Sequence, residues 1–143
     1  MISIKTLYYD VGNAVKGICD KVYPRNRPKS VADRPDNYIV VSFPSSIYNN
    51  EMNDDGSFND YTTTAQIEVY VRDKTSARNP NTLNVSAVSE KVGAVMTKFP
   101  ISTDNIIVTK PRVTLQTDDG DGFSVTIIHG SLRTKSTQKL RFN

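Results

Sequence analysis

The chain has 143 residues, of which 37% are hydrophobic and 23% are charged, and its formal net charge is +3. This size and composition are typical of one globular domain with its own core, and no apolar run approaches the ~20 residues that span a bilayer. The one cysteine, Cys19, excludes an internal disulfide, and the N-terminus lacks the uninterrupted apolar region of a signal peptide. We therefore expect a single domain, 1–143, made in a cytoplasm.

The first predicted element is an amphipathic helix over residues 3–22. Apolar residues recur there at spacings of three and four, which places them on one helical face. Ser3 is a residue type that caps helices, and Pro24 stops the helix. Cys19 borders the apolar face, so we expect a buried, unreactive thiol.

A basic connector follows, and an acidic region comes after it. Residues 23–37 hold three prolines and four cationic side chains, which predicts an extended, exposed connection. Residues 36–68 then carry six acids and no lysine or arginine. Blocks of opposite charge can steer one surface toward a complementary one. The alternative is that both blocks lie on solvated loops.

Two strands are predicted around a long polar segment. Residues 37–43 form a short β-branched run that suits a buried strand, and residues 63–73 alternate between apolar and polar side chains. Residues 44–60 between them have no period, so we expect an extended loop or a hairpin arm. Loops of this length are usually functional or disordered.

The second half predicts one helix and two strands. Helical spacing returns over residues 82–99, and two β-rich runs follow at 105–117 and 123–136. Pro111 removes a hydrogen-bond donor from the centre of the first run, so this strand is predicted to lie at an edge or to carry a bulge. We predict an α+β fold, with a mostly antiparallel sheet of about four strands and two helices packed on one face, in the order α-β-(long loop or hairpin arm)-β-α-β-β. The last residues, 137–143, are expected to form a C-terminal tail.

The sequence DDGDG, 118–122, separates the last two predicted strands. Its aspartates suggest a calcium loop, but in EF-hand register Thr117 takes the first ligand position and Ile128 the twelfth. The acidic stretch from Glu51 ends on Thr62 in the same register. Asp-Gly pairs favour tight turns, so we predict a hairpin turn and no metal site.

Few residues offer catalytic chemistry. His129 is the one histidine and lies within a predicted strand, where a structural or surface role is expected. The seven glycines never form a phosphate-binding motif, and one cysteine with one histidine cannot build a Cys/His metal cluster. We predict that the protein is not an enzyme and binds no cofactor.

Nucleic-acid binding is the alternative function. The segment 21–34 contains five cations and Tyr23, and the segment 133–141 contains four cations and is followed by Phe142. Such segments can neutralise phosphates and stack a base. The acidic 36–68 region would repel DNA, and the sequence carries no recognition-helix signature.

The order of elements resembles the tail-terminator or tail-completion (neck) proteins of tailed bacteriophages. The resemblance covers roughly residues 4–133 and is carried by the N-terminal helix, its VYP exit, the basic connector, NYIVVSF, QIEVYVRD, the second helix and the strand pair around TDDGDGFSV. It implies a non-catalytic virion protein at the head–tail junction or tail end, assembled in the host cytoplasm. Small neck proteins of short-tailed phages are an equal comparison.

The resemblance also implies partners. These are further copies of the chain in a ring (a hexamer or dodecamer), other neck or tail proteins, genomic DNA that passes through the lumen without specific recognition, and no membrane. Unlike surfaces of identical subunits can close into such a ring. The charged blocks supply the candidate inter-subunit residues: Arg25, Arg27, Lys29, Arg34, Glu51, Asp54, Asp55, Asp60, Arg133, Lys135, Lys139 and Arg141.

Overall fold

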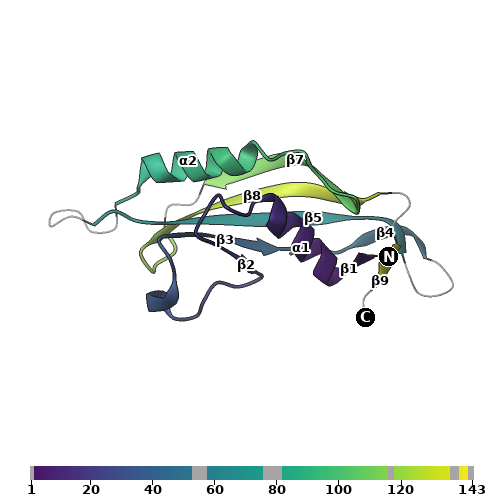
Figure 1. The fold of residues 1–143 in the computed structure, drawn as a ribbon, viewed down its shortest axis with the longest axis horizontal. Coiled ribbons are helices and arrows are strands. Elements are labelled where there is room, and N and C mark those ends of the chain that lie inside the picture. Colours follow the sequence, from purple (N-terminus) through teal and green to yellow (C-terminus); the bar gives the residue numbers. More distant parts are fainter. Residues whose placement is uncertain (1, 53–57, 76–81, 116–117, 136–138, 142–143) are drawn as a thin grey trace.

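A computed structural model describes residues 2–52, 58–75, 82–115, 118–135 and 139–141 (Figure 1). Its described residues form one mostly antiparallel sheet and two α-helices, which confirms the α+β class. The elements are β1 (Ile2–Ser3), α1 (Ile4–Ala14), β2 (Lys21–Pro24), the short 3-10 helix η1 (Val31–Asp33), β3 (Asn37–Ser42), β4 (Tyr48–Met52), β5 (Phe58–Arg72), α2 (Val85–Met96), β6 (Ile101–Ser102), β7 (Ile106–Leu115), β8 (Phe123–Thr134) and β9 (Lys139–Arg141).

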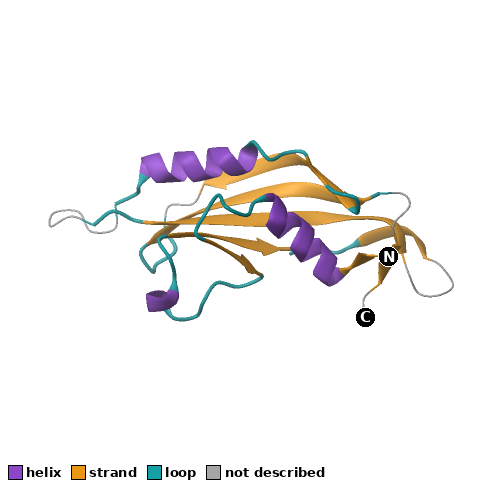
Figure 2. Cartoon of the chain, viewed as in Figure 1, coloured by secondary structure: helices purple, strands orange, loops and turns teal. Residues whose placement is uncertain are grey.

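The four predicted strands are the four long ones, β3, β5, β7 and β8. The expected count of about four is nevertheless wrong, because the described residues contain nine strands. The other five strands have five residues or fewer, too short for an alternating pattern to reveal them. The main path through the sheet runs β1-β9-β5-β8-β7-β6, while β3 and β4 pair with β5 and β2 pairs with β3. Figure 2 shows β5, β7 and β8 side by side along the long axis.

Helix α1 is shorter than predicted. Its N-terminus is capped as expected: the Ser3 hydroxyl accepts from the Thr6 amide at 3.2 Å, and the Thr6 hydroxyl accepts from the Ser3 amide at 3.4 Å, completing a capping box. The helix ends at Ala14, and Gly17 then adopts a left-handed φ of 88° that continues the chain out of the helix. The last predicted helical residues instead form β2, a parallel neighbour of β3.

Both helices pack on the same face of the sheet. Alternate side chains of β5, including Ile67 and Val69, join Leu7 and Val11 of α1 and Val95 of α2 in one buried cluster. The intervening side chains of β5 point to the opposite face. The core therefore lies between the sheet and the helices, and part of the opposite face remains open.

Strand β5 extends beyond the body of the sheet. Its pairing with β8 covers Thr62 to Arg72, whereas Phe58 and Asn59 pair with β9 and β4 in the part of the chain that the structure describes. The described part of the predicted 44–60 segment thus includes β4, which pairs with the start of β5 as a hairpin arm. The predicted tail contains β9, which pairs with both β1 and β5.

Pro111 marks a bulge, as predicted. The β7–β8 register shifts between Thr109 and Arg112, and the short β6 pairs only with Ile107 and Val108, so the remainder of β7 has one paired neighbour among the described residues. Strands β7 and β8 are antiparallel, which agrees with a hairpin at 118–122. None of the helices in the described ranges is long and apolar enough to cross a membrane.

Candidate functional site: a groove lined by cations and hydroxyls

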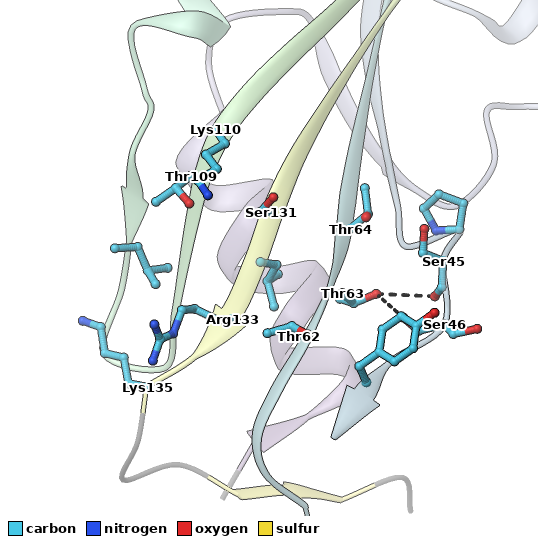
Figure 3. Close-up of a pocket in the computed structure, with 14 residues that line it drawn as sticks. Ser45, Ser46, Thr62, Thr63, Thr64, Thr109, Lys110, Ser131, Arg133 and Lys135 are labelled. Carbon is cyan, nitrogen blue, oxygen red and sulfur yellow. Dashed lines mark hydrogen bonds between the residues drawn. The ribbon is translucent and has the colours of Figure 1, made fainter. Parts of the chain in front are cut away.

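A groove of about 1370 Å³ opens over the ends of β5, β7 and β8 and the segment that precedes β4. Figure 3 shows Thr109, Lys110 and Arg133 on one side and Ser45 and Ser46 on the other. The described lining residues include no acid. They comprise seven serines and threonines (Ser45, Ser46, Thr62, Thr63, Thr64, Thr109 and Ser131), three cations (Lys110, Arg133 and Lys135), and Pro44, Tyr48, Ile107 and Leu132.

Strand register gathers several of these polar groups on the face away from the helices. Thr62 lies opposite Arg133, and Thr64 lies opposite Ser131. On the other side of β8, Thr109 also lies opposite Ser131. Directly opposed residues of antiparallel strands share a face. The floor of the groove is therefore formed by neighbouring hydroxyls, with the Arg133 guanidinium at one end.

The bulge in β7 brings Lys110 to the rim of the groove. Lys110 has a left-handed φ of 54°, next to the register shift that precedes Arg112. Bulges commonly redirect a side chain in this way. Lys110 is exposed, and it was absent from the predicted site residues because a lysine in a β-run gives no sign of its direction. The signal that points to it is Pro111.

A hydrogen bond holds the opposite wall. The Thr63 hydroxyl donates to the Ser46 carbonyl at 3.1 Å, with the Ser45 carbonyl at 3.4 Å. At the groove's far corner, the Lys135 amide donates to the Asn105 carbonyl at 3.1 Å. Hydrogen bonds therefore fix both edges of the groove, one from a side-chain hydroxyl and one between backbone atoms, which favours a preformed shape.

A carboxylate lies on the same face beyond the groove. Glu68 accepts hydrogen bonds from the Gln66 amide at 2.6 Å and from the Tyr70 hydroxyl at 2.8 Å. Burial, together with the bond to Glu68, raises the pKa of Tyr70 well above its usual value, so its proton stays on the phenol. The cationic character of this face thus ends before Glu68.

The remainder of this face is covered by the basic connector. Tyr38, Val40 and Phe123 form a second buried cluster there, with Tyr23 and Tyr70 packed against it. Figure 2 shows the connector with its short helix η1 beside the edge strands. From the connector, Tyr23 packs edge-on against Tyr38, and the Arg27 guanidinium lies 4.7 Å from the centroid of the Tyr70 ring. The connector is therefore packed on the sheet, and the expectation of an extended, exposed connection is wrong.

Two arginines of the connector pair with the DDGDG turn. Arg27 donates to the carboxylates of Asp119 and Asp121, the latter at 3.2 Å. Arg34, which is buried, donates to Asp121 at 3.0 Å and to the Lys29 carbonyl at 3.1 Å. The turn sequence therefore supplies acids to a clamp within the chain.

Charges in this clamp change their proton affinities. Partial burial of the Asp119 carboxylate acts to raise its pKa, but hydrogen bonds from Arg27 and from the amides of Asp121 and Phe123 outweigh it, and the pKa is lowered. Burial likewise opposes the charge of Arg27, and its bonds to Asp119 and Tyr38 raise its pKa overall. Both groups are ionised at neutral pH.

The predicted inter-subunit residues occupy several places. Arg133 and Lys135 line the groove together. Arg27 and Arg34 belong to the internal clamp, whereas Arg25 and Lys29 are exposed. Glu51 lies in β4, Asp60 in β5, and Lys139 and Arg141 in β9. Asp54 and Asp55 lie outside the described residues.

The residues considered for catalysis have structural surroundings. His129 is half-buried and lies 2.9 Å from the Gln66 side-chain oxygen, a neutral partner. Cys19 is buried as predicted, and burial, partly offset by Lys91, raises the pKa of its thiol to about 11. In the described ranges, no group of three or more His, Cys, Asp or Glu residues is arranged so that it could hold a metal ion.

Comparison with solved structures includes a distant likeness to a virion chain. No protein-family model matches the chain, and no curated protein matches it. A chain from the structure titled "Virion of native gene transfer agent (GTA) particle" is 12% identical, with a TM-score of 0.48 over 87% of this chain and 83% of that chain.

Proposed function

We propose that the protein is a non-catalytic structural component of a tailed-phage virion. In this role it assembles into a ring at the head–tail junction or tail end, as a hexamer or dodecamer, and contacts other neck or tail proteins. The sequence resemblance described above supports the virion role. The self-association is supported by features of the fold.

The extension of β5 carries the argument for self-association. Beyond Thr62 the strand leaves β8, and among the described residues β4 and β9 pair with it there. This end of the sheet projects past the β8 pairing, so a neighbouring subunit can contact it without displacing β8. The position of the arm therefore suits an interface.

Exposed apolar side chains give further support. Val113 and Leu115 lie on the helix-facing side of β7 yet are 41% and 72% exposed. Val85, at the start of α2, is 64% exposed. Large apolar side chains at a surface are a feature of protein interfaces when they cluster. These residues lie away from the groove, so one subunit offers two unlike surfaces, as a head-to-tail ring requires.

Size-exclusion chromatography with light scattering tests this proposal. We expect a mass of six or twelve subunits at micromolar concentration, and a particle with a central hole by electron microscopy. The variant Leu115→Glu should lower the assembled fraction, whereas Lys98→Glu, an exposed site on the α2–β6 connection, should not. A chain that stays monomeric with and without its virion neighbours contradicts the proposal.

Nucleic-acid binding remains the second candidate, and the groove is the observation that favours it. Hydroxyls and cations are the usual partners of backbone phosphates. The basic connector is the weaker of the two segments proposed to bind nucleic acid. Two of its cations, Arg27 and Arg34, pair with Asp119 and Asp121 inside the chain. A salt-dependent gel shift with wild-type protein distinguishes this candidate from a ring that excludes DNA.

A further inference from the structure

The groove has three cations on its rim, and the described side chains that line it include no acid to neutralise them. Lys110, Arg133 and Lys135 come from β7, β8 and the residue just after β8. Arg27 and Arg34, in contrast, are neutralised by the turn. A surface that concentrates like charge beside hydrogen-bonding hydroxyls favours a negatively charged ligand.

The chain itself carries a segment of matching charge. Residues 51–60, EMNDDGSFND, contain four acids and no cation. Glu51 lies in β4 and Asp60 in β5, at the arm that projects from the sheet. Four carboxylates against three cations make a short acidic peptide of this composition complementary to the groove.

The protein's own arm leads away from its own groove. β5 is one continuous strand from Phe58 to Arg72, and the groove begins at Thr62. At about 3.3 Å per residue, the strand places Phe58 roughly 13 Å past Thr62. A second copy of the chain can present the same segment without bending its strand.

The face beyond the groove carries an acid on β5. A nucleic-acid backbone that ran along β5 from Thr64 would pass Gln66 and then meet the Glu68 carboxylate, which Gln66 and Tyr70 hold in place, while the exposed Arg112 of β7 lies opposite His129 on the same face. The Glu68 charge opposes a continuous polyanion along β5, whereas a short peptide ends before it. The hydroxyls of Thr62, Thr64 and Ser131 can bond a peptide backbone as well as carboxylates.

We infer that this groove receives the acidic 51–60 segment of a neighbouring copy of the same chain. The contact is heterologous, since arm and groove are different surfaces, and repetition about an axis closes a ring. The inference rests on the proposed function and adds to it the surface and the segment that meet. Each subunit would then give one arm and accept one.

A labelled peptide tests the groove without requiring assembly. A fluorescent peptide of residues 49–61 is titrated with full-length protein at a concentration below that of self-association, and anisotropy is read. The groove variant is Lys110→Asn, Arg133→Gln and Lys135→Gln, because Asn tolerates the positive φ of Lys110. We expect its affinity to fall about tenfold or more, as three exposed charge pairs are lost.

Matched controls separate the site from general charge. The variant Lys16→Gln, Lys74→Gln and Lys98→Gln removes three exposed cations outside the groove and should bind the peptide as wild type does. A peptide with its four acids amidated should bind wild type as weakly as the acidic peptide binds the groove variant. Equal loss in both protein variants, or unchanged binding to the groove variant, overturns the inference.

Charge reversal tests the contact in the assembled protein. Lys110→Asp with Arg133→Glu, and separately Asp54→Lys with Asp55→Lys, should each reduce assembly, while both changes in one chain should restore it. If wild type assembles and the groove reversal has no effect, the groove inference fails and the ring proposal stands. If wild type never assembles, the ring proposal fails, and the peptide titration still reports on the groove.

A DNA-binding measurement tests the competing use of the groove. Loss of single-stranded DNA binding without loss of peptide binding in the groove variant assigns the groove to nucleic acid and overturns the inference.

Discussion

Arg27 in the basic connector donates a hydrogen bond to Asp119, which lies 92 positions later in the chain. The bond joins a segment that looks like a phosphate-binding stretch to a turn that looks like a calcium loop. The charges of the basic connector and of the acidic turn thus neutralise each other within one subunit. The same arginine also bonds the Tyr38 hydroxyl at 3.1 Å and lies over the Tyr70 ring, so it covers the second buried cluster.

Removal of the Arg27 guanidinium should destabilise the fold. Arg27→Gln leaves the Asp119 carboxylate, whose side chain is 6% exposed, without its ionic partner. We expect a loss of about 1–3 kcal/mol in the free energy of unfolding, since hydrogen bonds to charged groups contribute in this range. Urea titration followed by circular dichroism measures it. Lys29→Gln removes an exposed cation from the same connector and should change the stability by less than about 0.5 kcal/mol; equal losses in the two variants contradict the clamp.

The clamp also predicts a pH dependence with a defined sign. The folded pKa of Asp119 lies below its unfolded value, so the unfolded chain binds more protons as the pH falls. The stabilisation is complete above the unfolded value of about 4 and is lost as the pH falls through the lower folded value. We expect the stability difference between wild type and Asp119→Asn to be constant from pH 7 to 5 and to shrink toward pH 3. A difference that does not change with pH contradicts the assigned role of the charge.

Much of the fold followed from the sequence because the signals were local. The alternation in β5 and the apolar stripes of α1 and α2 each reflect burial on one face, and Pro111 indicated the bulge for a reason of backbone chemistry. The helix predicted at the N-terminus was too long because apolar residues after Ala14 are also buried, in turns and in β2. Periodicity indicates which residues are buried. It does not indicate that the helix ends at Ala14 or that Gly17 then adopts a left-handed conformation.

The candidate site was only partly predictable. Arg133 and Lys135 were identified from the charge of the C-terminal segment, but the same reasoning grouped them with Arg27, whose charge is used inside the chain. Which cations stay free depends on contacts between segments some 90 residues apart, and these contacts leave no local pattern. The hydroxyls of the groove were missed because Ser and Thr on an outer face look like ordinary solvent-facing residues.

Gly130 should not tolerate even a methyl group. A Cβ placed there would lie 2.6 Å from Val108 Cγ1 and 3.0 Å from Phe99 Cε1, closer than packed atoms allow. We expect Gly130→Ala to lose about 1–3 kcal/mol of unfolding free energy through overpacking, measured by thermal or urea unfolding. Gly93→Ala is the control: nothing lies within 4 Å of its Cβ position in α2, so it should gain about 0.5–1 kcal/mol from helix propensity.

A double variant checks the cause of the Gly130 effect. Val108→Ala alone should destabilise by leaving a small cavity, because Val108 is fully buried. Combined with Gly130→Ala, it removes the atom that clashes at 2.6 Å. The double variant should therefore lose less unfolding free energy than the sum of the losses in the two single variants. Additive losses would mean that the clash with Val108 is not the source of the effect.

Cys19 should react slowly in the native protein and quickly in the unfolded one. Its thiol is buried and its pKa is raised to about 11, so at pH 8 its thiolate fraction is about a hundredfold below that of an ordinary cysteine. Only the thiolate attacks an aromatic disulfide reagent, and burial restricts access further. We expect the labelling rate at pH 8 to rise at least a hundredfold in denaturing urea, with free cysteine as the reference in both solvents. Fast labelling of the native chain would contradict a buried thiol packed beside Lys91.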